Sequence, residues 1–375
     1  MVNFPEDWGL TSLGEVSRVR TGTRNHNEKS VSGKYPFFVR SATIERIDSY
    51  SYDTEAVLVP GEGNIGSIFH YIRGKFDVHQ RVYVISEFPD GVSGQFVFWY
   101  MKYIFGDHAL QNTSKATVDS LRLPVFRSFP LRLPQLKEQN AIAEVLSGFD
   151  EHLANLDELI AKKKNIRDGA VEELVTGCTR IADYQDPWRE VPLDSIVHSR
   201  RESVGTELMS MDVELENIVP GEGRLVGDTS VRTASSFIFR TGDVLFGRLR
   251  PYLRKFWYAT NIGVRSGEIW ALVAKEEVDS KFLFHLVRTQ RFLDSAGKTM
   301  GTKMPRADWN LMKSQRFCIP HSFEEQRAIA EVLSEMDEEI RLLVEERAKI
   351  ELLKLGTMDD LLTGRVRLPI EEEAA

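Results

Sequence analysis

Residues 138–181 read EQNAIAEVLSGFDEHLANLDELIAKKKNIRDGAVEELVTGCTRI, and residues 325–368 read EQRAIAEVLSEMDEEIRLLVEERAKIELLKLGTMDDLLTGRVRL. The second stretch lies 187 positions after the first without a gap, and 20 of the 44 aligned pairs are identical. An internal repeat is interpreted first, because it fixes the architecture of the whole chain. We therefore expect a protein built from two similar halves.

Both copies have the pattern of a long amphipathic helix. Apolar residues recur at alternating spacings of four and three, which is the heptad seam of a coiled coil. The seam residues, which we expect to pack between helices or against a partner, are Ile142, Leu146, Phe149, Leu153 and Leu156 in the first copy, and Ile329, Leu333, Met336, Ile340 and Leu343 in the second. Charged residues interrupt the seam at Lys163 and Arg167 and at Arg347 and Lys354, so a kink or two shorter helices are also compatible with it.

The flanking residues set the expected helix limits. Each copy follows a proline, Pro134 or Pro320, and ends at a Thr-Gly pair whose glycine, Gly177 or Gly364, can adopt a left-handed conformation. About 40 residues at roughly 1.5 Å each give a helix of about 60 Å. A single helix of this kind is usually a core or dimerising helix. Two similar helices can instead pack antiparallel, relate the halves by an approximate twofold axis and set a fixed distance between them.

The composition is that of a globular protein with more than one domain. The chain has 375 residues, of which 42% are hydrophobic and 28% charged. It has no run of 18 apolar residues and no basic region followed by an apolar run at its start, so we expect a cytoplasmic location. The two cysteines, Cys178 and Cys318, do not match any zinc spacing and are interpreted as ordinary thiols.

The order along the chain is globular domain, helix, globular domain, helix. We expect an α+β fold with domains at 1–133 and 183–318 and helical regions at 134–182 and 319–375. The net charge of −8 argues at first against nucleic acid. However, residues 1–133 carry 15 basic and 14 acidic side chains and residues 183–318 carry 20 and 18, so the acidic excess belongs to the helical regions. Acidic helices suit protein partners, and the nearly neutral domains leave room for a basic face.

No catalytic motif stands out. Residues 61–66, GEGNIG, match the G-x-G-x-x-G fingerprint of dinucleotide sites, which requires a following helix. The next residues, Ser67 to Ile72, have a strand pattern, so a glycine turn or a DNA-facing loop is the better interpretation. No P-loop and no amino-methyltransferase tetrapeptide is present, and His70 and His79 do not have helical metal-ligand spacing.

Basic and amide side chains gather instead in polar loops of both domains. Arginine can bind guanine, asparagine can bind adenine, and lysine commonly binds phosphate. Any one of these residues alone is more simply a solvated surface charge, but clusters in duplicated domains favour DNA. The predicted DNA-binding residues are Arg24, Asn25, Lys29, Asn112 and Lys115 in the first domain, and Arg200, Arg201, Arg248, Arg250, Arg254, Lys255, Lys298, Lys303 and Arg306 in the second.

The sequence resembles the specificity (S) subunits of type I restriction-modification enzymes over essentially its whole length. The resemblance rests on Pro-x(4 or 5)-Gln at the start of each helix, on Ala-Ile-Ala-Glu-Val-Leu in both copies, and on the Thr-Gly ends. Residues 242–253, GDVLFGRLRPYL, also resemble a segment typical of the target-recognition domains of that family.

The resemblance implies a non-catalytic subunit in which each target-recognition domain binds one half of a bipartite double-stranded DNA site and antiparallel helices set the spacer. It implies two methylating subunits docked on the helices and restriction subunits joined to that core. S-adenosylmethionine, ATP and magnesium would then be used by the partners, with no cofactor or metal on this chain.

Three alternatives remain open at this stage. The chain could be the recognition subunit of another multi-subunit DNA methylation or phage-defence system, which its co-purifying partners would reveal. A self-contained nuclease or methyltransferase would modify DNA alone. A coiled-coil adaptor would show neither sequence preference nor salt-dependent DNA binding.

Overall fold

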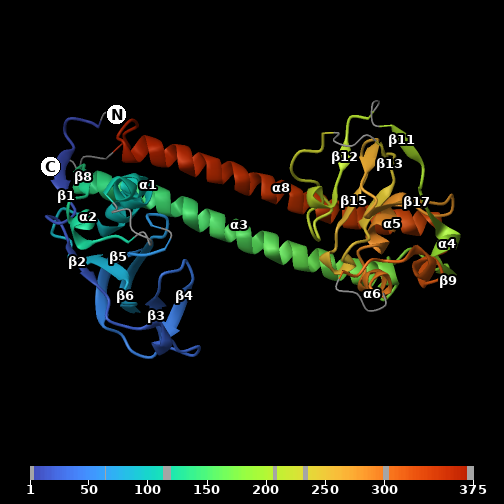
Figure 1. Cartoon of the computed structure of the whole chain (residues 1–375), viewed down its shortest axis with the longest axis horizontal. Coiled ribbons are helices and arrows are strands. Elements are labelled where there is room, and N and C mark those ends of the chain that lie inside the picture. Colours follow the sequence, from blue (N-terminus) through green and yellow to red (C-terminus); the bar gives the residue numbers. More distant parts are fainter. Residues whose placement is uncertain are drawn as a thin grey trace. The chain divides into compact units, whose positions relative to one another are not determined.

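The computed structural model divides the chain into two compact units (Figure 1). The structure describes residues 4–63, 65–112, 120–205, 209–230, 235–298 and 304–369. Unit 1 comprises residues 1–157 and 346–375, and unit 2 comprises residues 158–345. Each unit therefore contains one globular domain and a part of both long helices, α3 (Leu136–Thr176) and α8 (Phe323–Leu362).

The globular domain of unit 1 contains a six-stranded sheet in the order β2-β7-β5-β6-β3-β4. Only the β3–β6 pair among these is parallel. A short antiparallel pair, β1 with β8, joins the two ends of the domain, and helices α1 and α2 complete it. The bounds are β1 (Gly9–Ser12), β2 (Arg18–Thr21), β3 (Tyr35–Phe38), β4 (Ile44–Ile47), β5 (Tyr52–Pro60), β6 (His70–Val78), β7 (Val82–Ser86), α1 (Gly94–Asn112), α2 (Leu123–Arg127) and β8 (Pro130–Leu133).

The central strand β5 shows why this sheet forms. Residues 56–59 are fully buried, and successive side chains of a strand point to opposite faces. Val57 and Val59 belong to the cluster that contains the aromatic residues of α1, whereas Ala56 and Leu58 belong to a second cluster on the other face. The uninterrupted apolar run is therefore a strand covered on both sides.

The globular domain of unit 2 has two four-stranded sheets, ordered β10-β17-β14-β15 and β11-β13-β16-β12. Its two ends are also joined by a short antiparallel pair, β9 with β18. The bounds are β9 (Trp188–Pro192), α4 (Leu193–Ile196), β10 (Val197–Ser199), β11 (Ser203–Gly205), β12 (Asp212–Val213), β13 (Ser235–Phe239), β14 (Val244–Gly247), β15 (Phe256–Tyr258), β16 (Gly263–Arg265), β17 (Ile269–Ala274), α5 (Ser280–Leu286), α6 (Gln290–Ala296), α7 (Trp309–Met312) and β18 (Arg316–Pro320).

The two long helices run antiparallel within each unit. In unit 1, Asp157 of α3 pairs with Arg347 of α8 at 2.6 Å, and Asp150 pairs with Lys354 further along α8. In unit 2, Lys163 pairs with Glu339 at 2.6 Å and Arg167 with Asp337 at 2.5 Å. In each unit, paired residues have falling residue numbers on α8 as their residue numbers on α3 rise. This confirms that the two helices are antiparallel, as expected.

The charged residues that interrupt the heptad seam do not break either helix. Each helix is one continuous element, so the alternative of two shorter helices is wrong. Lys163, Arg167, Arg347 and Lys354 face the partner helix and form ion pairs with it, and these ion pairs occupy the places of apolar contacts.

The predicted helix ends are confirmed. Gly177 and Gly364 have φ values of 77° and 69°, the left-handed conformation that glycine adopts most readily. Behind them, the amide of Thr179 donates to the carbonyl of Glu173 at 3.1 Å, a bond that satisfies a terminal carbonyl of α3.

Two local expectations have different outcomes. The apolar sequence of residues 282–293 predicts one helical stretch, but the structure has two helices there, α5 and α6. Thr289 caps the second helix by accepting from the amide of Phe292. The glycine-rich residues 61–63 and 65–66 lead into strand β6, so the helix that a dinucleotide fingerprint requires is not there.

Candidate nucleic-acid interface

The basic loop between β14 and β15 has a fixed backbone. Its centre is a short 3-10 turn, Pro251–Leu253, flanked by Arg250 and Arg254 with φ values of 51° and 53°. Positive φ is costly for a residue with a side chain, and such residues persist where the surroundings hold them. The amide of Arg250 donates to the carbonyl of Pro305 at 2.8 Å, and Leu249 forms an isolated bridge with Arg306. The structure thus brings the predicted residues of 248–255 together with Arg306.

Three arginines of this loop differ from their neighbours in their contacts with the rest of the described domain. In the described part of the chain, Arg248, Arg250 and Arg254 have no carboxylate partner, and their Nε atoms are buried without a hydrogen-bond partner. The guanidinium of Arg248 lies 6.0 Å from the centre of the Trp270 ring. These arginine side chains are only half-buried, and a guanidinium donates readily to an anion or to the acceptor edge of a base.

The neighbouring basic side chains, Arg306 and Lys255, already have hydrogen-bond partners within the domain. Arg306 donates from Nε to the carboxylate of Glu268 at 3.1 Å, and Lys255 donates to the carbonyl of Leu215 at 2.5 Å. The exposed side chain of Tyr252 lies between the positive-φ arginines. The loop therefore combines arginines that have no described carboxylate partner with an exposed aromatic ring.

Two other predicted residues form ion pairs inside their domains. Arg200 contacts both carboxylate oxygens of buried Asp243, at 2.8 and 3.1 Å, and these contacts raise the pKa of its guanidinium. Arg24 donates from Nε to buried Asp77 at 2.9 Å and also pairs with Glu28. These contacts hold the fold of each domain together.

The remaining predicted residues lie apart from that loop or outside the described residues. Lys29 pairs with Glu45 at 3.1 Å, and Lys298 donates to the side chain of Gln315 at 3.0 Å. The side chains of Asn25, Asn112 and Arg201 are exposed, and Lys115 and Lys303 lie outside the described residues.

The equivalent loop of unit 1 has different chemistry. Glu62, which lies 187 positions before Leu249, forms an isolated bridge with Ser120. Its carboxylate lies 3.5 Å from Arg40 and 3.0 Å from Arg81, two largely exposed arginines that sequence reasoning missed. No local pattern marks Arg40 and Arg81, because they meet Glu62 only through sheet pairing.

The seam residues have the burial expected of a helix interface. Ile142 and Leu146 enter the core of unit 1, and Ile329 and Leu333 enter the core of unit 2. The other seam residues are buried or half-buried, and these are Phe149, Leu153, Leu156, Met336, Ile340 and Leu343.

Polar residues of the repeat make the more specific contacts. In unit 2, Arg180 donates to both oxygens of buried Glu325, at 3.0 and 2.8 Å. In unit 1, Arg367 makes the same contact with buried Glu138. In each unit the start of one copy is thus bonded to the end of the other. Sequence reasoning missed these residues, although all four are identical between the copies.

Glutamines at the start of each copy join helix and domain. Gln326 donates to the carbonyls of Glu277 and Pro320, both at 3.1 Å, and accepts from the amide of Asp279 at 3.0 Å. Gln139 makes the same three kinds of contact in unit 1. The Gln in each Pro-x(4 or 5)-Gln motif therefore orients the first turn of a long helix against its own domain.

Other site types find little support in the described residues. No group of three or more His, Cys, Asp or Glu side chains in those ranges could hold a metal ion. None of the helices described has both the length and the apolar content needed to cross a bilayer.

The chain belongs to the family described as type I restriction modification DNA specificity domain, whose model matches residues 5–165 and 223–352. It is 24% identical over 375 residues to the type I restriction enzyme EcoDI specificity subunit of Escherichia coli, covering 89% of this chain and 83% of that protein. It is 22% identical over 411 residues to the MjaVIII specificity subunit of Methanocaldococcus jannaschii, covering 98% and 95%.

Solved structures show the same fold. The type I restriction-modification S subunit from M. genitalium matches with a TM-score of 0.65 at 15% identity, over 96% of both chains. A chain from a study of complex assembly in the type I R-M system matches with a TM-score of 0.57 at 15% identity, covering 97% of this chain and all of the other.

Proposed function

We propose that the two globular domains of this chain each bind one half of a bipartite DNA site. As a member of the type I restriction modification DNA specificity family, the chain is the subunit that selects the DNA sequence. In this proposal, residues 1–133 and 183–318 are the target-recognition domains. Residues 134–182 and 319–375 are the helical regions that set the spacer.

One observation carries the proposal, namely that equivalent loops of the duplicated domains differ in charge. In both domains the second residue after a central strand forms a bridge to a later segment, Glu62 with Ser120 and Leu249 with Arg306. Among the described residues, the arginines of the unit 2 loop have no carboxylate partner, whereas Glu62 in unit 1 holds two arginines in ion pairs. Domains with one frame and different loops suit two different half-sites, because base contacts depend on individual side chains.

The expected partners follow from the family and from the charge of the helices. Residues 319–375 carry 15 acidic and 7 basic side chains, a balance that favours protein over phosphate. We expect methylating subunits to dock on the helices and restriction subunits to join them. We also expect S-adenosylmethionine, ATP and magnesium to act on those partners, with this chain contributing no catalytic residue.

The direct test is single-molecule sequencing of adenine methylation in a host that expresses the chain with its methylating subunit. We expect a new bipartite motif with a fixed spacer of unspecified bases. A host that lacks the chain is the control. If the complex assembled but no methylated motif appeared, the chain would be better explained as a coiled-coil adaptor, and the basic loops would be ordinary solvated surface.

A second test addresses the spacer. A seven-residue insertion within 150–165 of α3, matched by one within 338–354 of α8, leaves the interhelical pairs on each side intact. Seven residues add about 10 Å, which is close to three base pairs of B-DNA at about 3.4 Å each. We expect the spacer to lengthen by about three base pairs with both half-sites retained. An unchanged spacer length would contradict the proposal that the length of the helices sets the spacer.

A further inference from the structure

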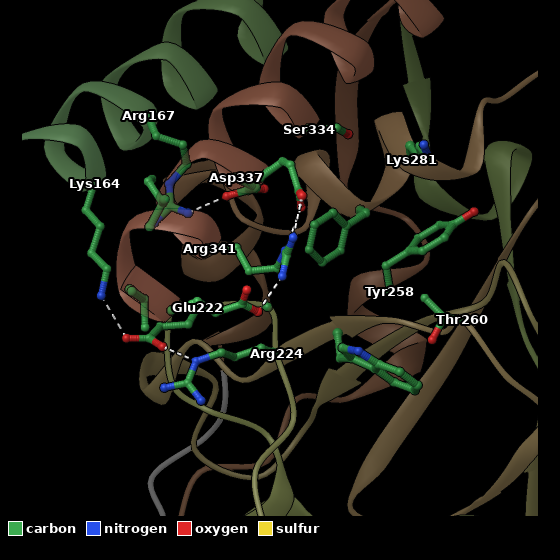
Figure 2. Close-up of a pocket in the computed structure, with 17 residues that line it drawn as sticks. Lys164, Arg167, Glu222, Arg224, Tyr258, Thr260, Lys281, Ser334, Asp337 and Arg341 are labelled. Atoms are coloured by element: carbon green, nitrogen blue, oxygen red, sulfur yellow. Dashed lines mark hydrogen bonds and ion pairs between the residues drawn. The ribbon is translucent and has the colours of Figure 1, made fainter. Parts of the chain in front are cut away.

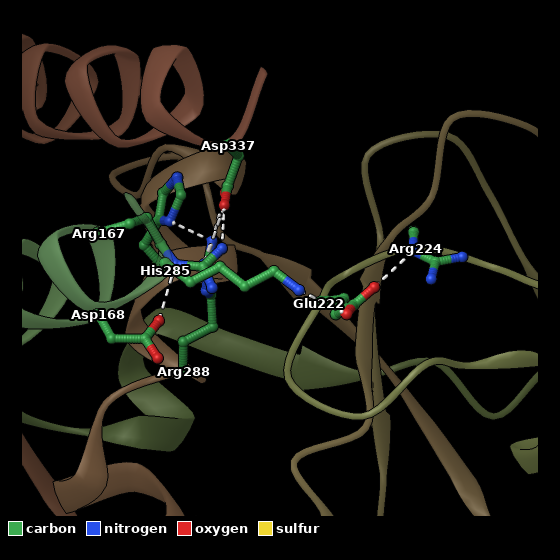
Figure 3. A network of polar contacts seen from close by, with 8 residues as sticks. Arg167, Asp168, Glu222, Arg224, His285, Arg288 and Asp337 are labelled. Atoms are coloured by element: carbon green, nitrogen blue, oxygen red, sulfur yellow. Dashed lines mark hydrogen bonds and ion pairs between the residues drawn. The ribbon is translucent and has the colours of Figure 1, made fainter. Parts of the chain in front are cut away.

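Asp337 is the meeting point of three elements in unit 2 (Figure 3). It lies on α8 and accepts from Arg167 of α3 at 2.5 Å. It also accepts from Arg288, which follows α5 in the globular domain, at 2.5 and 3.1 Å. Only 5% of the Arg167 side chain and 2% of the Arg288 side chain are exposed. One carboxylate thus joins both long helices to the domain.

His285 completes this Asp337 cluster, which we define as Arg167, His285, Arg288 and Asp337. The imidazole is fully buried, and its Nδ1 lies 3.1 Å from Nη1 of Arg288. A guanidinium can only donate, so Nδ1 accepts and the ring is neutral. Burial, together with the charge of Arg288, lowers the pKa of His285 to about 3. Burial alone would raise the pKa of Asp337, but Arg288 and Arg167 outweigh it and lower that pKa, so the carboxylate is ionised.

A second polar contact joins the domain to the helices. Lys164 of α3 donates to Glu222 at 2.8 Å, and Glu222 also accepts from Nε of Arg224 at 2.6 Å (Figures 2 and 3). Glu222 lies in a loop of the globular domain, away from the Asp337 cluster along the chain. The domain is therefore tied to α3 and α8 at two separate polar positions.

A cavity of about 580 Å³ lies beside these contacts, with the domain on one side and α8 on the other (Figure 2). Trp257, Tyr258 and Phe284 line it from the domain, and Ile340 and Val344 line it from α8. Protein interiors are normally close-packed. Apolar packing is interrupted at this cavity, although Ile329 and Leu333 of α8 pack into the domain core elsewhere. The polar contacts beside the cavity therefore add directional contacts to a less directional apolar interface.

Unit 1 contains a corresponding cluster at positions related by the repeat. Asp150 pairs with Lys354 of α8, and Lys102 of the domain lies 3.7 Å from its carboxylate. In this segment the offset is 186 positions, as for the amides of Ser93 and Asp279, which bond Gln139 and Gln326. Trp99 is therefore equivalent to His285, and its ring centre lies 4.8 and 4.9 Å from the ammonium groups of Lys102 and Lys354. The plan is the same in both units, but lysines replace the two arginines and the Asp150 side chain is 42% exposed.

We propose that Asp337 and Arg288 are positioning residues that fix the orientation of the second target-recognition domain on the helix pair and so restrict the complex to one spacer length. This inference rests on the proposed function. Arginine binds a carboxylate through two parallel bonds of fixed direction, which a lysine cannot do. Any rotation of the domain would leave a buried charge unpaired, so the cluster selects one orientation.

The test uses the full chain in complex with its methylating subunit, with Asp337→Asn compared with the unaltered chain. The DNA is a set of sites with both half-sites fixed and the spacer varied by one base pair in each direction. We expect the unaltered chain to support methylation at one spacer only. We expect Asp337→Asn to retain both half-sites but to accept neighbouring spacers at about one tenth of the cognate rate or more.

Asp168→Asn is the matched control. Asp168 also bonds Arg167, at 2.7 Å, but its side chain is 45% exposed, and no described hydrogen bond or ion pair joins it to the globular domain. It should keep the single spacer.

Arg288→Lys keeps the test decisive if Asp337→Asn does not assemble, because unit 1 already uses lysine at the equivalent position. It should assemble and relax the spacer. The inference is overturned if the assembled variants methylate only the original spacer at the normal rate, or if they change the preferred bases of a half-site. Absence of any motif with the unaltered chain would instead count against the proposed function itself.

Discussion

Lowering the pH from 7.5 to 5 should destabilise unit 2 by about 2 kcal/mol through one side chain, His285. In the folded chain the pKa of this imidazole is about 3, because it is buried and its Nδ1 faces Arg288. In the unfolded chain its pKa is about 6.5. Below pH 6.5 the unfolded state therefore binds a proton that the folded state excludes. Each pH unit between 6.5 and 3 costs about 1.4 kcal/mol, which over 1.5 units gives the stated loss.

The assay is urea denaturation of the full chain at both pH values, with the unaltered protein and His285→Gln side by side. Glutamine keeps an acceptor for Arg288 but cannot be protonated, and the acidic side chains titrate alike in both proteins. We expect the acid-induced fall in the unfolding midpoint to be about 1 M urea smaller in the variant, for an m value of about 2 kcal/mol/M. The same fall in both proteins would refute the assignment of a neutral, proton-excluding His285.

Two further predictions concern the arginines of unit 2. Arg248→Ala and Arg250→Ala should each weaken binding at one half-site and reduce the slope of log K against log salt concentration by about one, with the thermal unfolding midpoint little changed. Fluorescence titrations over a salt series measure this. Equal loss at both half-sites would contradict modular recognition. Arg200→Ala should instead lower the free energy of unfolding by about 3 kcal/mol, because it leaves the buried carboxylate of Asp243 without its bidentate partner. Urea denaturation measures this. An unaffected unfolding midpoint would contradict a structural role for the ion pair between Arg200 and Asp243.

The helices could be predicted from the sequence because their signals are local and occur twice. Heptad spacing, the preceding prolines and the glycines at 177 and 364 each depend on residues within a few turns. The antiparallel arrangement followed from the duplication. The break at Thr289 could not be predicted in the same way, because the surrounding residues are apolar enough for one helix. The chain turns there in the structure, and Arg288 bonds Asp337 from a distant part of the sequence.

The candidate interface was only partly predictable, since the sequence shows which cations are close together but not which carboxylates neutralise them. Arg200 is neutralised by Asp243 and Arg24 by Asp77, through sheet contacts that no local pattern encodes. The basic character of residues 248–255 was visible, but the positive φ values at both ends of its turn were not. The ion pair between Glu325 and Arg180 had one overlooked signal, identity between copies at polar positions.

The start of each repeat copy is bonded to the end of the other copy, and this affects the order in which the two units can fold during translation. Unit 2 is contiguous, so all of its residues have been synthesised once residue 345 is added. Unit 1 is not contiguous, and the buried carboxylate of Glu138 acquires its arginine only when residue 367 emerges. Of the two domains, the one that is translated earlier is therefore finished later. Until α8 emerges, the apolar faces of Ile142 and Leu146 lack the helix segment that joins the same core, and exposed apolar surface of this kind is prone to aggregate.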